Sequence, residues 1–280
     1  MPLIHDTYGK GRVRVMRVTR GARQEVRELT AQVMLEGAAF AAAYTAADNR
    51  AVIATDTVKN LAYIVAREHL DADAEPYGQA LAQRFLDRYQ QVGRVAVTLH
   101  ETRWTRFAPG GVPHPHAFLL DGNGQGYARV TAGRDGEAVI ESGVRGFTFL
   151  KSTESGWVDY VMDDVTTLAP TRDRIAATSM DATWRWASPP ARYPEANQRV
   201  LDAMLHVFAT TYSHGIQDSL YRMGEAALAA VPELADLGVA CPNKHYIPVD
   251  LDRFGLDANN QVFVATDEPH GQIECRVGRG

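Results

Sequence analysis

Apolar and polar residues alternate near the start of the chain as they do in half-buried strands. Val13 and Val15 alternate with arginines between residues 12 and 18, which predicts a strand. Residues 26–36 read as a second strand that ends at Gly37. The arginines of the first segment therefore belong to one face of a strand, and no other Lys/Arg-rich run is present to suggest a nucleic-acid surface.

Two helical patterns follow these strands, because apolar residues recur every three or four positions. The first pattern opens at Asp56 and Thr57, and its apolar face consists of Val58, Leu61, Ala62 and Val65. Possible N-caps are Thr55, Asp56 and Thr57. The second pattern restarts at Pro76 and ends before Gly93, and it carries Leu81, Phe85, Leu86 and Tyr89.

Alternation then returns and predicts two further strands. Val95, Val97 and Leu99 indicate a third strand, and residues 116–120 indicate a fourth after a turn at Gly110-Gly111.

The second half repeats this order. Strands are predicted at residues 127–132, 137–150 and 174–186, a helix after Pro194 and another near Ser213, and final strands at 244–251 and 261–265. The apolar faces of these two helices are Val200, Ala203, Met204, Val207 and Phe208, then Ile216, Leu220, Met223 and Ala227.

The order strand-strand-helix-helix-strand-strand therefore occurs twice, which predicts an α+β fold. Hairpin connections imply antiparallel sheets with helices on one face. We expect one repeat in residues 1–125 and the other in residues 126–280. Open sheets leave edges that need pairing, so we also expect an oligomer.

Composition narrows the class of protein. The 280 residues are 45% hydrophobic and 22% charged with a net charge of −5, which is typical of a globular chain that does not bind nucleic acid. The two cysteines form no disulfide framework, which favours a reducing compartment. No apolar stretch approaches a membrane span, no signal peptide opens the chain and no Ser-Lys-Leu peroxisomal address closes it, so we expect a cytoplasmic protein.

The common catalytic and cofactor motifs are missing. The sequence has no Gly-x-Gly-x-x-Gly after a strand, no P-loop, no Gly-x-Ser-x-Gly and no His-Glu-x-x-His. His114 and His116 form a close pair without an acidic or cysteine partner nearby, so we expect no metal site.

Three short segments are ambiguous when each is taken alone. Tyr8-Gly9-Lys10 is compatible with an ordinary strand start, Ala54-Thr55-Asp56 with a helix cap, and Asn243-Lys244-His245 with a turn. Together, in this order and spacing, they resemble the urate oxidase (uricase) family. Matches between them include Arg103-Trp104-Thr105-Arg106, Pro113-His114-Pro115-His116, Leu150-Lys151-Ser152-Thr153, Asp173-Arg174-Ile175 and Asp181-Ala182-Thr183-Trp184.

The resemblance covers nearly the whole chain and implies a function. It implies the tunnelling fold, with two strand-strand-helix-helix-strand-strand units per chain. It implies oxidation of urate by O₂ and water to 5-hydroxyisourate and hydrogen peroxide, a step of purine degradation, with no cofactor. It also implies a homotetramer whose active sites are shared between subunits.

The resemblance assigns roles to individual residues. Arg174 and Gln217 are expected to hold the edge of urate, since a guanidinium fork and an amide match a planar anionic edge. The backbones of Asp56 and Ile216 are expected to add contacts, and Asn243 together with Thr55 to hold oxygen or water above the ring.

Lys10, Thr55 and His245 are expected to form a proton relay. A threonine hydroxyl is a weak base unless another group takes its proton, and a desolvated lysine is suited to that task. His245 is suited to passing protons near neutral pH.

One loop departs from the family pattern. The family stacks a phenylalanine under the ring, and an ungapped count places Trp157 at that position. An indole stacks on a purine as well as a phenyl group does. The alternative is that Trp157 is a core residue and that Tyr160 approaches the ring.

Two other functions stay open. One is another enzyme of the same fold, a cyclohydrolase or aldolase-like protein acting on a pterin or purine. The other is a non-catalytic purine- or pterin-binding protein that has kept the fold.

Overall fold

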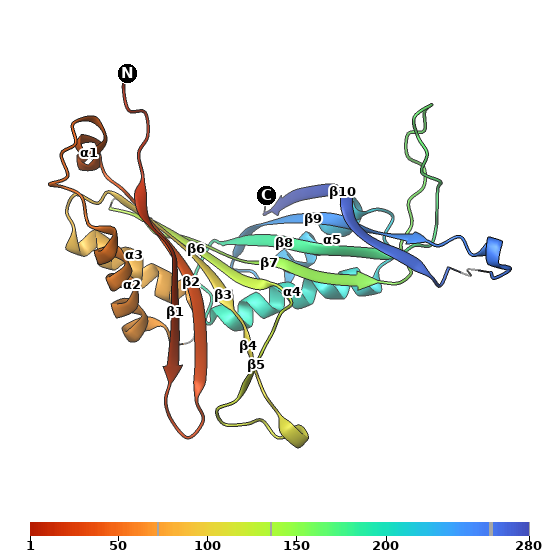
Figure 1. The fold of residues 1–280 in the computed structure, drawn as a ribbon, viewed down its shortest axis with the longest axis horizontal. Coiled ribbons are helices and arrows are strands. Elements are labelled where there is room, and N and C mark those ends of the chain that lie inside the picture. The colour runs from red at the N-terminus through yellow and green to blue at the C-terminus, as the bar shows by residue number, and fades with distance from the viewer. Residues whose placement is uncertain (72, 135, 258–259, 280) are drawn as a thin grey trace. The chain divides into compact units, whose positions relative to one another are not determined.

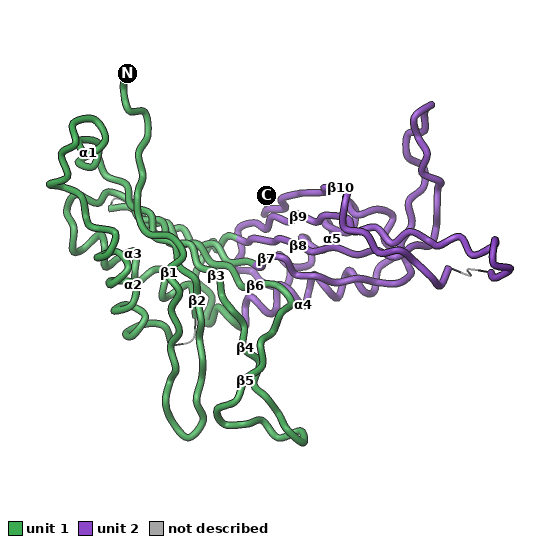
Figure 2. Tube along the Cα trace, in the orientation of Figure 1, with its two compact units in different colours: residues 1–143, 185–194 green, residues 144–184, 195–280 purple. Residues whose placement is uncertain are grey.

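The computed structural model describes residues 1–71, 73–134, 136–257 and 260–279. The chain divides into two compact units (Figure 2). Unit 1 consists of Met1–Gly143 and Arg185–Pro194, and unit 2 consists of Val144–Trp184 and Glu195–Gly280. These units are defined by contacts and not by sequence repeats, so the predicted boundary between residues 125 and 126 stays a prediction.

Unit 1 is built on four strands (Figure 1). Their order is β1 (Tyr8–Thr19), β2 (Glu25–Glu36), β3 (Arg94–Thr102) and β6 (Gln125–Gly133), and each strand runs antiparallel to the next. Helix α2 (Thr55–His69) packs on β1, and α3 (Ala74–Arg88) packs on β3 and β6. The short elements of the unit are η1 (Ala38–Phe40), α1 (Ala41–Thr45) and η2 (Pro109–Gly111).

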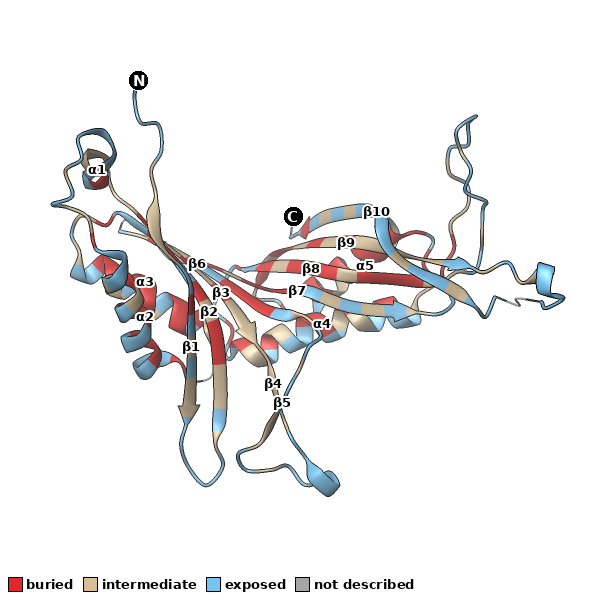
Figure 3. Cartoon of the chain, viewed as in Figure 1, coloured by how far each residue is buried: buried red, intermediate tan, exposed pale blue. Residues whose placement is uncertain are grey.

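The helix side of this sheet forms the core of unit 1. Val95, Val97 and Leu99 of β3 are fully buried, and the residues between them are only half-buried. Figure 3 shows buried stretches in the strands of this unit and along α2 and α3. All four predicted face residues of α2 are buried as well. The period of two in the strands and of 3.6 in the helices thus brings the apolar side chains to one interface.

One prediction for unit 1 was right only in part, and another was wrong. A strand does form within residues 116–120, but this strand, β5 (Phe118–Leu120), pairs with β4 (Trp104–Arg106) in a separate two-stranded sheet and is not the fourth strand of the main sheet. Leu119 and Leu120 are exposed, whereas β6 supplies the buried residues that belong beside β3. The N-cap of α2 is Ala54, and no side chain caps this helix.

Unit 2 has the same arrangement. Its strands follow the order β7 (Val139–Lys151), β8 (Ala176–Trp186), β9 (Leu234–Pro248) and β10 (Phe263–Gly278), and β9 is antiparallel to β10. The first five residues of β7 and the last two of β8 are assigned to unit 1. Its helices are α4 (Tyr193–Thr210) and α5 (Ile216–Ala230), and η3 (Asp252–Phe254) lies in the loop between β9 and β10. The predicted α+β fold with antiparallel sheets is confirmed.

The last two strands are longer than the sequence suggested. β9 begins at Leu234 and not at residue 244, and β10 continues to Gly278 and does not end at 265. Leu237, Val239 and Cys241 are buried at alternate positions of β9, as in a strand that covers a core. Asn243 therefore lies inside a strand and not in a turn.

In each unit, an arginine directly after a strand donates hydrogen bonds to carbonyl oxygens at and beyond the C-terminus of a long helix, α3 in unit 1 and α5 in unit 2. Arg134, directly after β6, donates to the carbonyl oxygens of Leu86, Tyr89 and Val92 at 2.8, 2.6 and 2.8 Å. Arg279, directly after β10, donates in the same way to Leu228, Val231 and Leu234. Carbonyls at a helix end lack intrahelical partners, and a cation there also complements the helix dipole.

Among the described residues, no helix combines the length and apolar character that a membrane crossing requires.

We expect Arg279→Ala to lower the free energy of unfolding by about 1–2 kcal/mol, because three carbonyl oxygens lose a charged donor at a partly exposed site. The control is Arg23→Ala, whose exposed pair with Glu25 at 3.4 Å is expected to contribute less than about 0.5 kcal/mol. Urea unfolding monitored by circular dichroism measures both. Equal midpoints for the two variants would refute the capping role.

Candidate functional site

Lys10 lies where the pairing of β1 with β2 is interrupted. It is opposite Val33, but Val13 is opposite Ala31, so β1 holds one extra residue between them. Arg12, inside this bulge, has a φ of 55°, in the left-handed region. Bulges next to functional sites redirect side chains, and this one follows Lys10 directly.

The N-terminus of α2 carries Thr55 and Asp56. The Asp56 carboxylate receives hydrogen bonds from Lys59 at 2.5 Å and Asn60 at 3.0 Å. These bonds and the charge of Lys59 lower the pKa of Asp56, with a smaller contribution from the charge of Lys10. The carboxylate is thus bound to its own helix, and the first-turn N–H groups of α2 have no side-chain cap.

Arg174 lies just before β8 and has a partly buried guanidinium. Its backbone N–H donates to Ser155 at 2.9 Å, which fixes the start of the segment. Its Nε is buried without a hydrogen-bond partner, and burial lowers the pKa of the guanidinium. A buried donor without a partner is costly, so this group is suited to receive an anionic ligand.

Trp157 lies beneath this guanidinium, with 5.8 Å between the Arg174 Cζ and the indole centroid. Its backbone pairs with Thr171 through bonds of 2.7 and 3.0 Å. Tyr160 stacks on the indole with centroids 5.7 Å apart and an interplanar angle of 13°, and its hydroxyl donates to Leu168 at 2.5 Å. Trp157 is half-buried and so is not a core residue, and which ring faces a ligand stays a prediction.

The start of α5 contacts the same indole. Gly215 is the N-cap, no side chain caps the helix, and Ile216 and Gln217 are its first residues. A Cβ at Gly215 would lie 2.7 Å from the Trp157 ring and 3.4 Å from the Gln217 Oε1, so only glycine fits here without a shift. Sequence reasoning missed Gly215, because its role depends on a ring 58 positions away, between residues 157 and 215.

Asn243 and His245 lie on β9 opposite the second interruption in a strand ladder. Asn243 is opposite Gly271 and His245 is opposite Thr266, so β10 holds three extra residues between these two pairs. The two side chains are two positions apart and share a face of the strand. Lys244, between them, pairs with Asp267 at 3.2 Å in the interrupted segment.

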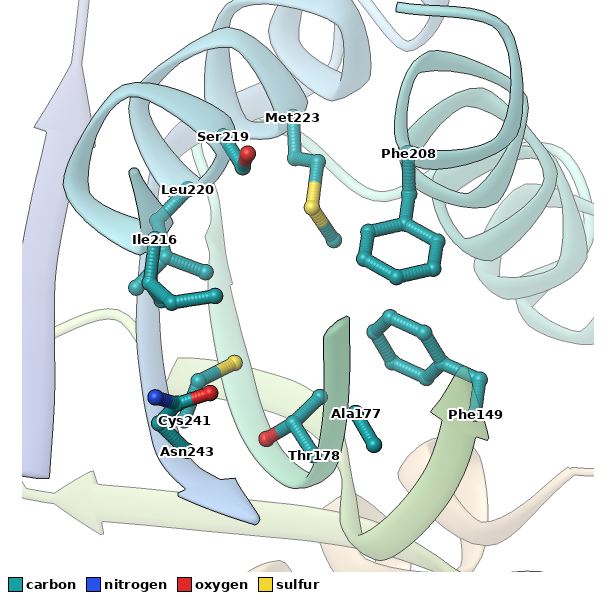
Figure 4. A pocket seen from close by; sticks show the side chains of 10 residues that line it. All are labelled: Phe149, Ala177, Thr178, Phe208, Ile216, Ser219, Leu220, Met223, Cys241 and Asn243. Carbon is teal, nitrogen blue, oxygen red and sulfur yellow. The ribbon is translucent and has the colours of Figure 1, made fainter. Parts of the chain in front are cut away.

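A small cavity lies beside Asn243 in unit 2 (Figure 4). It is lined by Phe149, Ala177, Thr178, Phe208, Ile216, Ser219, Leu220, Met223, Cys241 and Asn243. Ile216 and Asn243, both predicted site residues, lie at this cavity, which is otherwise mostly apolar.

The predicted residues fall into two groups. Unit 1 holds Lys10, Thr55 and Asp56, and unit 2 holds Trp157, Arg174, Ile216, Gln217, Asn243 and His245. Among the described residues, no group of three or more His, Cys, Asp or Glu side chains is arranged to hold a metal ion. The roles of the individual residues stay predictions.

The thiol of Cys241 offers a test of this buried environment. Burial raises its pKa to about 12, outweighing the hydrogen bond with Thr178. Only the thiolate reacts with Ellman's reagent, so we expect native Cys241 to react far more slowly than free cysteine at about pH 8. The rate should increase about tenfold per pH unit up to this pKa.

Cys275→Ser leaves Cys241 as the single thiol and serves as the background for this measurement. Unfolding in urea should release one fast-reacting thiol. Rapid labelling of the native protein at about pH 8 would contradict a closed, apolar cavity wall.

Comparisons with known proteins identify the family of the whole chain. The uricase family model matches residues 6–131 and 140–274. A uricase of Dictyostelium discoideum is 33% identical over 99% of this chain and 97% of its own length, and one of Aspergillus flavus is 34% identical over 97% and 95%. The crystal structure of uricase from Arthrobacter globiformis superposes with a TM-score of 0.94 at 36% identity, covering 100% of this chain and 95% of that one. This chain belongs to the uricase family.

Proposed function

We propose that this protein is a urate oxidase that converts urate, O₂ and water to 5-hydroxyisourate and hydrogen peroxide in purine degradation. One structural observation supports this proposed activity most strongly. Arg174, whose Nε is buried and unpartnered, holds its guanidinium over the Trp157 indole, and the same indole lies against Gly215, the N-cap of α5, which has no side-chain cap. Together they offer a donor fork, an aromatic floor and backbone N–H groups to a flat anion.

The binding half of the site follows from these groups. Arg174 donates two parallel hydrogen bonds to an anionic oxygen and a ring nitrogen. Gln217 matches an edge with both a donor and an acceptor, because its amide supplies both. Trp157 forms the floor of the site, and Tyr160 supports it from within the same loop. The backbones of Asp56 and Ile216 add N–H donors.

The reaction needs proton movement and a site for oxygen. Urate must carry more negative charge than it has in neutral solution before it gives up electrons. Thr55 takes a proton from urate and passes it to Lys10, and His245 exchanges protons with the oxygen species. Asn243 and Thr55 hold oxygen, peroxide or water above the ring. A protein that binds the anion, moves protons and places oxygen supplies the needed catalysis.

The oxidation itself draws electrons from the substrate. Ground-state oxygen is a triplet, so it accepts one electron at a time from the electron-rich urate dianion. The resulting radical pair combines to a hydroperoxide, which loses hydrogen peroxide and takes up water. We infer that no flavin and no metal takes part, since urate and O₂ exchange the electrons directly.

We infer that complete sites form between subunits of a homotetramer. Lys10 and Thr55 belong to unit 1, whereas Arg174, Gln217 and His245 belong to unit 2. β1 ends the strand order of unit 1 and β10 ends that of unit 2, and each leaves an edge that needs a partner. Two copies that pair edge to edge satisfy both strands. The two free cysteines agree with a reducing compartment such as the cytoplasm.

We expect the purified protein to consume urate and O₂ with one peroxide formed per urate, and at the same rate in the presence of a metal chelator.

Arg174→Lys keeps the charge but loses the donor fork, so kcat/KM should fall about 10-fold to 100-fold. The control is Arg172→Lys, an exposed arginine two positions earlier, which should change kcat/KM less than about twofold. Binding of a purine analogue without peroxide formation would instead support a non-catalytic binding protein.

Shared sites predict complementation between inactive chains. Thr55→Ala and Arg174→Ala should each be nearly inactive alone. In a mixed two-fold dimer, one site carries both lesions and the other carries none. Random pairing makes about half of the dimers mixed, so about a quarter of wild-type activity should return on co-expression. Verified mixed dimers without activity would refute the shared site, but they would not count against the proposed oxidation of urate.

A further inference from the structure

The loop that leads into Thr55 is held by a side chain from β1. The hydroxyl oxygen of Tyr8 accepts a hydrogen bond from the Ile53 N–H at 2.8 Å. Ile53 is only 5% exposed and lies two residues before Thr55. No side chain caps α2, and this bond holds the backbone at the entry to the helix from outside the helix.

Tyr8 is itself well anchored. Its ring packs edge to face against the buried Phe40, with centroids 4.9 Å apart. Burial raises the pKa of Tyr8, and this effect outweighs the hydrogen bond from Ile53. The hydroxyl therefore stays neutral near pH 7, and its oxygen remains available as an acceptor.

The same strand presents Lys10. Tyr8 and Lys10 are two positions apart and thus share a face of β1, ahead of the bulge. Between them, a Cβ on Gly9 would overlap the carbonyl oxygen of Val33, so glycine permits the close approach of β1 to β2. The start of β1 therefore carries Lys10 and, through Tyr8, holds the loop that leads into Thr55.

A second bond holds the same loop on its other side. The Gln91 side chain donates to the carbonyl oxygen of Ala51 at 3.1 Å. The loop is thus fixed at Ala51 and at Ile53, from two different segments of unit 1. Such double anchoring restricts the backbone just before a residue that must meet a substrate closely.

We propose that Tyr8 is a positioning residue that sets Thr55 against Lys10 for proton transfer. This inference rests on the proposed function, in which Thr55 passes a proton to Lys10. Tyr8 does not touch the substrate and acts through the Ile53 backbone. Its effect should therefore appear mainly in turnover, since Arg174 and Gln217 hold the ring edge and only the Asp56 backbone N–H adds a binding contact from this segment.

The test is Tyr8→Phe, which keeps the ring against Phe40 and removes the acceptor of the Ile53 N–H. We expect kcat to fall about 10-fold, because small misplacements of a reacting group are costly. The dissociation constant of 8-azaxanthine, a non-reactive purine, should change less than about twofold. Hydrogen exchange at Ile53 should accelerate, which reports the lost bond independently of activity.

The matched control is Tyr44→Phe. It removes a tyrosine hydroxyl from the same region, one that donates to the Thr7 carbonyl at 3.3 Å. Its kcat should stay within about twofold of wild type. If Tyr8→Phe does not fold, Gln91→Leu releases the loop at Ala51 and should lower kcat in the same direction with unchanged analogue binding.

A double-mutant cycle separates positioning from general damage to the fold. Once Thr55 is replaced by alanine, adding Tyr8→Phe should change the residual kcat less than about twofold, because the two residues act as one unit. Undiminished kcat in Tyr8→Phe, or an equal loss in both backgrounds, overturns the positioning role. Wild-type protein that binds 8-azaxanthine but forms no peroxide overturns the proposed function itself.

Discussion

The burial of one sheet face beneath two helices is the constraint on which each unit depends. In unit 1 the alternating apolar residues of β3 meet α3, and in unit 2 those of β9 meet α5. Burial of this kind is the main favourable contribution to folding. It fixes the register of every strand, because a shift by one residue would turn the apolar face outward. The polar site residues must therefore lie where a ladder can be interrupted without loss of the core.

The ladders β1–β2 and β9–β10 each contain one such interruption among the described residues, and both interruptions lie beside predicted site residues. The bulge in β1 follows Lys10, and the longer insertion in β10 faces Asn243 and His245. At these points the pairing register shifts and the backbone leaves its regular ladder. The starts of α2 and α5, each without a side-chain cap, add N–H groups that can bind an anion. The fold thus supplies ligand-binding groups at the margins of its core.

The sequence predicted those parts of the fold in which local periodicity and burial agree. Val58 and Leu61 of α2, and Leu220 and Met223 of α5, recur at helical spacing and are all buried. The start of β9 was missed, because Asp236 and Gly238 do not read as strand formers, although their neighbours alternate.

The predictions from sequence failed where contacts between distant segments determine the local structure. Residues 116–120 have strand-like composition, but their exposed leucines belong to a separate hairpin. The cap of α2 was misassigned because the Asp56 carboxylate bonds to Lys59 and Asn60, and the loop before it is held by Tyr8.

In the candidate site, too, some residues could be predicted from the sequence and others could not. Resemblance to a family identified Arg174 and Gln217 as candidates, since such motifs are read residue by residue. It did not reveal Gly215, whose value lies in leaving room for the Trp157 ring, nor the bond from Ile53 to Tyr8. These roles arise from the distance between segments far apart in the chain, which no local pattern encodes.

A crystal structure of the assembled protein with 8-azaxanthine would show whether two subunits build one urate site. We expect the ring to lie on Trp157, with its edge held by the Arg174 guanidinium and the Gln217 amide of one subunit. Lys10 and Thr55 of a second subunit should face the same ring. An analogue bound away from Arg174, or a ring enclosed by residues of one chain alone, would refute the shared urate site.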